Sequence, residues 1–165
     1  RLKPAEIEIL RKSGLTRLMI GAESVIDQEV SLIKKNVTPN LITRISHLCK
    51  QYNIAACFSF IIGFPHSLES SIQQTIEFAS SLRKIDQRHE VQIRFYSPYP
   101  GTPLYSLALT SGFQPPKTLE EWSWYDYKNV NTPWVDSKYG PMIREFNEEN
   151  YPFLKESRWS DKDRD

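Results

Sequence analysis

FSFIIGFPHSLE, residues 58–69, contains an apolar run that stops at Gly63, turns through a Phe-Pro pair and leads into a helical pattern. A short run of aromatic and β-branched residues that ends at Gly and Pro predicts a buried strand. Two other stretches have the same form, LMIGAES at 18–24 and FYSPYPGTP at 95–103. Each stretch therefore predicts a strand whose end is held in a defined turn.

Helical patterns separate these strands, which are expected at about 16–22, 55–62 and 91–97. Thr38 followed by Pro39 predicts a capped helix start, and apolar residues then recur at helical spacing as far as Tyr52. Other helices are expected in residues 3–14, at about 28–35 and from near Ser67. Because strands and helices alternate, the sequence predicts an α/β fold with parallel strands joined by crossover helices.

Side-chain alternation predicts which face of each strand meets the helices. The bulky apolar residues are assigned to the helix side, and they are Phe58, Phe60 and Ile62 in the second strand and Val91, Ile93 and Phe95 in the third. The alternate residues are assigned to the other face, the lumen of a barrel, and they are Ser59, Ile61, Gly63, Gln92, Arg94 and Tyr96. The carboxyl ends of parallel strands are where α/β folds bind ligands, so a site is expected there.

Composition excludes several classes of function. The chain is 39% hydrophobic and 25% charged, and 21 basic residues oppose 20 acidic ones for a net charge of +1. That balance predicts no attraction to nucleic acid or to an anionic membrane. No apolar stretch is long enough to cross a bilayer, and no signal-peptide pattern is present. Two cysteines imply no disulfide framework, and a cytoplasmic location is expected.

Four motifs in order resemble the later barrel motifs of radical S-adenosylmethionine enzymes. They are GAES at 21–24, KK at 34–35, IIGFP at 61–65 and PYPGT at 98–102. The likeness is greatest to the group of methylthiotransferases and cobalamin-dependent members such as the anaerobic magnesium-protoporphyrin ester cyclase. It covers residues 1–112 and implies a partial, TIM-like barrel of six strands, of which this chain would hold strands four to six. Residues 113–165 would form an aromatic-rich C-terminal extension.

The resemblance also implies roles for single residues in binding S-adenosylmethionine. Glu23 and Ser24 would contact its ribose or methionine part, although Glu23 also reads as a cap of the helix near Asp27. Ile61 and Gly63 would line its adenine, and Tyr99, Pro100, Gly101 and Thr102 would close the adenine side. Ser59 and Tyr96 are further candidates for cofactor contacts. Arg94 and His66 are candidates for substrate contacts, and Arg94 and Tyr96 are equally read as partners of acidic groups elsewhere in the barrel. We expect Glu23, Ile61 and Tyr96 to converge on one hollow that receives a nucleoside.

Two departures from the family pattern qualify the resemblance. The family has Gly-Glu after the Phe-Pro pair, where this chain has His66 and Ser67, and Ser67 is predicted to cap the next helix. The family holds a 4Fe-4S cluster with CxxxCxxC, whereas Cys49 and Cys57 are too few. The cluster is therefore expected on a missing N-terminal half of the same protein, with an electron donor as partner and cobalamin as a second cofactor in part of the group. The isolated chain is predicted to be inactive.

Alternatives stay open at this point. The chain also fits a conventional α/β-barrel enzyme, or a non-catalytic half-barrel that binds a ligand. The aromatic-rich segment from Glu120 to Trp134 predicts a lid over the site, or simple packing of the extension onto the barrel. An aromatic platform for RNA is disfavoured because this segment is acidic. Three histidines, His47, His66 and His89, are predicted to face solvent, and the sequence does not specify a substrate.

Overall fold

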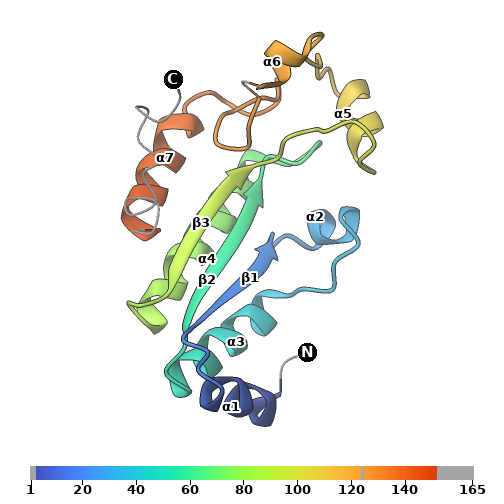
Figure 1. Ribbon diagram of the computed structural model, residues 1–165. Helices are drawn as coiled ribbons and strands as arrows, with labels where there is room; N and C mark the ends of the chain where they lie inside the picture. Colours follow the sequence, from blue (N-terminus) through green and yellow to red (C-terminus); the bar gives the residue numbers. More distant parts are fainter. Residues whose placement is uncertain (1–2, 124, 152–165) are drawn as a thin grey trace.

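The computed structural model describes residues 3–123 and 125–151. In chain order the elements are α1 (Pro4–Lys12), β1 (Arg17–Glu23), α2 (Asp27–Leu32), α3 (Pro39–Gln51), β2 (Ala55–Ile62), α4 (Glu69–Ile85), β3 (Glu90–Phe95), α5 (Tyr105–Thr110), α6 (Leu119–Ser123) and α7 (Tyr139–Asn150). The strands form one sheet in the order β1-β2-β3, and both pairs are parallel (Figure 1). The predicted α/β fold with parallel strands and crossover helices is confirmed.

One face of the sheet is covered by α3 and α4 (Figure 1). Its side chains are the bulky apolar residues assigned to the helix side from sequence, and they pack with Ile42 and Cys49 of α3 and with Ile72, Ala79 and Leu82 of α4. Alternation along each strand therefore places the apolar set in the core, as predicted. The alternate set, which includes Ser59, Ile61 and Arg94, faces the side that α3 and α4 leave uncovered.

The predicted N-cap is found at the start of α3 but not at the start of α4. Thr38 caps α3 by accepting a hydrogen bond from the Leu41 amide at 3.2 Å, as predicted. The prediction that Ser67 caps α4 is wrong, because Leu68 holds the N-cap position and makes no side-chain cap bond. The hydroxyl of Ser67 donates instead to the buried carboxylate of Glu29 on α2.

The C-terminal extension closes one edge of the sheet. The side-chain amide of Asn147 on α7 accepts from the Ile93 N–H and donates to the Ile93 carbonyl, both at 2.8 Å. Two residues further along β3, the Phe95 N–H donates to the Tyr127 carbonyl at 2.9 Å. Figure 1 shows α7 running beside β3. The edge of β3 is thereby supplied with partners that an edge strand otherwise lacks.

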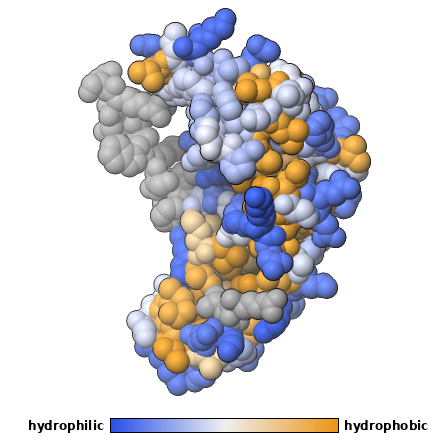
Figure 2. Space-filling model, turned by 90° about the vertical axis from the view of Figure 1, so that its right-hand side faces the viewer, coloured by the Kyte–Doolittle hydropathy of each residue, from blue (hydrophilic) through white to orange (hydrophobic). Residues whose placement is uncertain are grey.

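The opposite edge strand of the described sheet is β1. Figure 2 views the molecule from this side and shows hydrophobic residues exposed among strongly hydrophilic ones. Among the exposed large hydrophobic residues of the described chain are Met19 on β1, which is 66% exposed, and Ile9 on α1, which is 63% exposed. Within the described ranges, no helix has both the length and the apolar character needed to cross a membrane.

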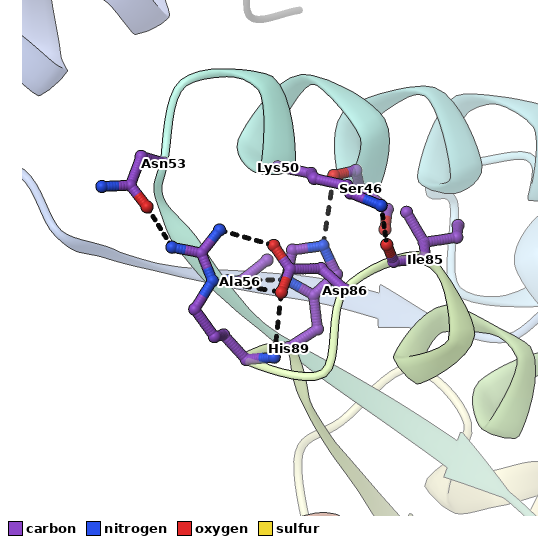
Figure 3. A network of polar contacts seen from close by, with 8 residues as sticks. Ser46, Lys50, Asn53, Ala56, Ile85, Asp86 and His89 are labelled. Carbon is purple, nitrogen blue, oxygen red and sulfur yellow. Dashed lines mark hydrogen bonds and ion pairs between the residues drawn. The ribbon is translucent and has the colours of Figure 1, made fainter.

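A polar network ties the amino ends of β2 and β3 to α3 (Figure 3). His89 is fully buried, so the prediction that it faces solvent is wrong, whereas His47 and His66 are exposed as predicted. The ring Nδ1 of His89 accepts from the Ala56 N–H at 3.2 Å, and Nε2 lies 3.1 Å from the Ser46 carbonyl, to which it donates. Burial lowers the pKa of His89, which keeps the ring neutral and suited to both bonds.

Candidate functional site

A pocket of about 530 Å³ opens at the carboxyl ends of β2 and β3, on the sheet face that lacks α3 and α4. Six of the residues predicted from sequence line it together, namely Ser59, Ile61, Arg94, Tyr96, Tyr99 and Thr102. The remaining walls come from residues 32–34 at the end of α2, from Phe64, from Phe95 and Ser97, from residues 103–104 and from Tyr127. The structure thus brings the strand ends and the loops that follow them around one hollow.

The register of the sheet explains why these side chains meet. Ile61 lies opposite Arg94 on neighbouring strands, so both point to the same face at the same level. The Tyr96 N–H donates to the Ile62 carbonyl at 2.8 Å, which continues the pairing one residue beyond β3. The following turn places Gly101 at φ 82°, where a side chain would be strained, and Thr102 donates to the Tyr99 carbonyl at 2.7 Å. This turn bends the chain back over the pocket.

Tyr96 supplies a polar atom that lacks a partner. Its hydroxyl is buried, and no described residue forms a hydrogen bond with it. Burial raises the pKa of Tyr96 to about 12, so the hydroxyl stays protonated and can donate. The Tyr125 hydroxyl, packed against the same cluster, is likewise buried without a hydrogen-bond partner among the described residues, so neither hydroxyl is an exposed donor on the pocket wall.

The carboxylate of Glu23 lies beside Gly21, which pairs with the pocket residue Ser59, but Glu23 is not among the residues that line the pocket. A register shift near the end of β1 places Glu23 at φ 61°, an uncommon conformation for a residue with a side chain. Its carboxylate lies over Gly21, where an added Cβ would come within 2.7 Å of Oε1, and it is paired with Lys35. The capping alternative is not seen, because α2 begins after Ile26 without a side-chain cap bond.

The other predicted residues lie outside the pocket wall. Ser24 is buried and donates its hydroxyl to Glu29, while His66 is exposed at φ 64°. Pro100 and Gly101 are exposed at the tip of the loop between two wall residues. Gly63 contacts the extension, because its carbonyl accepts from the Trp134 indole N–H at 3.0 Å. Their proposed contacts with a cofactor stay predictions.

Sequence reasoning missed the roles of Glu29 and Tyr127. Glu29 is buried and accepts hydroxyl bonds from Ser24 and Ser67, so it joins the loops after β1 and β2. No local pattern marks the link to β2, because Ser67 lies 38 residues from Glu29 in the sequence. Tyr127 lies in the aromatic-rich segment from Glu120 to Trp134. The prediction that this segment forms a lid was the signal that could have indicated a place for Tyr127 at the pocket.

An aromatic cluster joins the extension to the pocket. The ring of Tyr99 stacks on Trp122 of α6 with centroids 6.2 Å apart, and it meets Tyr125 edge-on at 5.6 Å. Tyr125 in turn contacts Phe113 at 5.9 Å. Trp124 of the same segment lies outside the described residues. The cluster holds the loop after β3 against the extension.

The two thiols do not fit an iron-sulfur cluster. Cys49 lies in the core under the sheet, and Cys57 lies on the pocket face of β2, so the sheet separates them. Burial raises the pKa of each to about 11, which keeps them as neutral thiols rather than ligating thiolates. No group of three or more His, Cys, Asp or Glu side chains in the described part of the chain is arranged to hold a metal ion.

No protein-family model matches the chain. An uncharacterized methyltransferase of Pyrococcus horikoshii is 28% identical over 122 residues, which are 74% of this chain and 25% of that protein. The chain therefore spans about a quarter of the length of the curated relative that it matches.

Solved structures share the fold at low sequence identity. The radical S-adenosylmethionine methyltransferase TsrM of Kitasatospora setae, solved with cobalamin and a [4Fe-4S] cluster, has a TM-score of 0.58 and 14% identity over 66% of this chain and 21% of its own. The coproporphyrinogen III oxidase HemN of Escherichia coli, named as a radical SAM enzyme, has a TM-score of 0.56 and 15% identity over 95% of this chain and 30% of its own. Elp3 of Methanocaldococcus infernus has a TM-score of 0.56 and 18% identity over 89% of this chain and 39% of its own. The chain has an α/β fold like that of radical S-adenosylmethionine enzymes.

Proposed function

We propose that this chain supplies the S-adenosylmethionine-binding strand ends of a radical S-adenosylmethionine enzyme, as part of a longer protein. The observation that carries the proposal is the convergence of Ser59, Ile61 and Tyr96 from neighbouring parallel strands on one pocket. The pocket lies at the strand ends where α/β folds bind their ligands, in a fold shared with two enzymes of this class.

The residues of the pocket fit the adenosine part of the cofactor. Its volume of about 530 Å³ is in the range of small-molecule sites. Ile61, Phe64 and Tyr99 offer apolar and aromatic surface to a purine. Glu23, beside the pocket, would have to exchange Lys35 for a ribose or ammonium group of the ligand.

The iron-sulfur cluster would be held by a part of the protein other than this chain. Cys49 and Cys57 are separated by the sheet, so they support this division. The edge of β1 and the exposed Met19 beside it are where the preceding strand of a barrel would pair. An electron donor for the cluster is a further partner under this proposal, and cobalamin stays a proposal supported by its presence in TsrM.

Methyl transfer is the reaction class that the relatives favour. The Pyrococcus protein and TsrM are both named methyltransferases. When bound, S-adenosylmethionine supplies a transferable methyl group and, with a reduced cluster, radical chemistry. The residues of this chain would bind and orient it and keep water from the reacting atoms.

Product analysis tests the proposal on the full protein. After anaerobic reconstitution with iron and sulfide and reduction, the protein is incubated with S-adenosylmethionine, and nucleoside products are measured by mass spectrometry. We expect 5′-deoxyadenosine, and also S-adenosylhomocysteine if methyl transfer is the reaction. Binding of S-adenosylmethionine without either product would instead favour a non-catalytic module, and absence of binding would overturn the proposal.

A further inference from the structure

Glu29 on α2 is a buried carboxylate whose two oxygens are held by two different loops. The Ser24 hydroxyl, in the loop after β1, donates to Oε2 at 2.5 Å, and the Ser67 hydroxyl, in the loop after β2, donates to Oε1. Glu29 is only 5% exposed, and none of the ion pairs among residues 3–123 and 125–151 includes it. A carboxylate removed from water needs hydrogen-bond donors, so the burial of Glu29 depends on these two hydroxyls.

Each of the two serines follows a residue in the left-handed region of backbone conformation. Glu23 directly precedes Ser24 and has φ 61°, and His66 directly precedes Ser67 and has φ 64°. Residues with side chains rarely adopt this conformation, and such a turn persists only where neighbouring contacts hold it. The Ser24 oxygen also accepts from the Ile26 N–H at 3.0 Å, which fixes the direction of its hydroxyl. The same carboxylate therefore braces two uncommon turns.

The two loops and α2 meet around the pocket. Phe64, in the loop after β2, lines it, and so do residues 32–34 at the end of α2. The helix has six residues, too few to hold its place without contacts to its neighbours. We propose that Glu29 is a positioning residue for the pocket, which sets the spacing of the two loops through Ser24 and Ser67. This inference rests on the proposed function for the identity of the ligand and adds to it the residue that holds the walls in register.

Binding of S-adenosylmethionine is measured by calorimetry on the full protein, at a temperature where circular dichroism shows that each variant is folded. Glu29→Ala removes both acceptors. Glu29→Gln keeps the shape of the side chain, and its amide can accept from Ser24 through the oxygen and donate to Ser67 through the nitrogen. Ser67→Ala, which removes one of the two donors, takes the place of Glu29→Ala should that variant fail to fold. The matched control is Glu77→Ala, because Glu77 is an exposed glutamate on α4.

Glu29→Ala should weaken binding about 10-fold or more, because displaced loops no longer present one fixed wall to the ligand. Glu29→Gln should stay within about 3-fold of the wild type, and Glu77→Ala should bind as the wild type does. A loss of stability alone does not change the affinity of the folded protein, so equal affinities of the wild type and Glu29→Ala would overturn the inference. An equal loss in Glu29→Gln and Glu29→Ala would also overturn it, because the charge and not the two hydrogen bonds would then be what matters.

Hydrogen exchange of the full protein without ligand separates this inference from the proposed function. In Glu29→Ala, peptides that cover residues 21–27 and 63–69 should both exchange faster than in the wild type, and in Glu77→Ala neither should change. Unchanged exchange in both loops of Glu29→Ala would overturn the inference, whatever the ligand of the pocket is. If the wild type does not bind S-adenosylmethionine while Glu29→Ala loosens both loops, the proposed function fails and the role of Glu29 in holding the loops stands.

Discussion

Val135 of the C-terminal extension packs directly against the backbone of Gly63 at the end of β2. A Cβ added to Gly63 would come within 2.6 Å of the Val135 Cγ2 atom, closer than real side chains approach. Gly63 also has φ 75°, a conformation that residues with side chains rarely adopt. The glycine that ends the strand thus permits both a turn and the docking of the extension.

Substitution of Gly63 by Ala is expected to destabilise the protein by about 2–4 kcal/mol, because overpacking adds to the strain of a positive φ. The free energy of unfolding in urea measures this loss. Gly14→Ala is the control, since Gly14 has φ 98° and nothing within 4 Å of an added Cβ. Gly14→Ala should cost about 1–2 kcal/mol, the strain alone. In a double-mutant cycle, Val135→Ala should recover part of the loss in Gly63→Ala, and additive losses would show that the contact with Val135 is not the cause.

Protonation of His89 should weaken the fold at mildly acidic pH. Burial holds the pKa of His89 below its ordinary value of 6.5, so the folded protein binds this proton less readily than the unfolded chain. The contribution to stability is then complete above about pH 6.5 and falls as the pH drops toward the pKa of the folded state, by at most about 1.4 kcal/mol per pH unit. Urea unfolding between pH 5 and pH 8 measures this slope.

The groups around His89 define the control for this pH dependence. Asp86 is bonded to Arg88, which lowers the pKa of Asp86 to about 2, so it stays charged throughout that range. Lys50, whose ammonium donates to the Ile85 carbonyl at 2.6 Å, opposes protonation of the ring (Figure 3). His89→Gln should flatten the profile, whereas His47→Gln, at an exposed position, should leave it unchanged. An unchanged profile in His89→Gln would assign the pH dependence to another group.

Asn147 is expected to protect the edge of β3. Asn147→Ala removes both hydrogen bonds to the Ile93 backbone and should cost about 1–3 kcal/mol. Amide hydrogen exchange is the sharper measurement, because the Ile93 N–H should exchange faster than its neighbours in the variant. Asn150→Ala on the same helix is the control, since the Asn150 side chain donates to the Phe146 carbonyl within α7. Equal protection of Ile93 in both variants would contradict the role of Asn147.

The fold was predictable because its signals are local. Alternation in residues 58–62 and the breakers after each strand predict the strands, and Thr38 with Pro39 predicts the start of α3. The start of α4 was not predictable in the same way. Ser67 has the chemistry of a cap, but its hydroxyl bonds to Glu29, which is 38 residues earlier in the sequence.

Strand periodicity predicted the part of the site that lies on the strands, whereas Tyr99 and Thr102 in the loop after β3 were predicted through the resemblance of PYPGT at 98–102. Ser59, Ile61, Arg94 and Tyr96 line the pocket because alternate residues of a strand share a face. Loop residues obey no such rule, and Gly63 meets Val135 instead of the pocket. The burial of His89 depends on Ser46 and Ala56, partners that no periodic pattern indicates.

The unpaired edge of β1 predicts how residues 1–165 behave when expressed alone. Because β1 ends the described sheet and Met19 is exposed beside it, residues 1–165 should dimerise or aggregate in solution. Light scattering after size-exclusion chromatography measures the mass. A monodisperse monomer that unfolds cooperatively would count against a missing neighbouring strand.

The central claim is that the pocket at the ends of β2 and β3 holds S-adenosylmethionine, and a variant that fills this pocket tests it most directly. Ser59→Trp places a large ring among the lining residues, while Ser106→Trp adds the same ring at an exposed position on α5. In calorimetry on the full protein, Ser59→Trp should weaken binding of S-adenosylmethionine about 10-fold or more, and Ser106→Trp should bind as the wild type does. Wild-type affinity in Ser59→Trp would contradict the account.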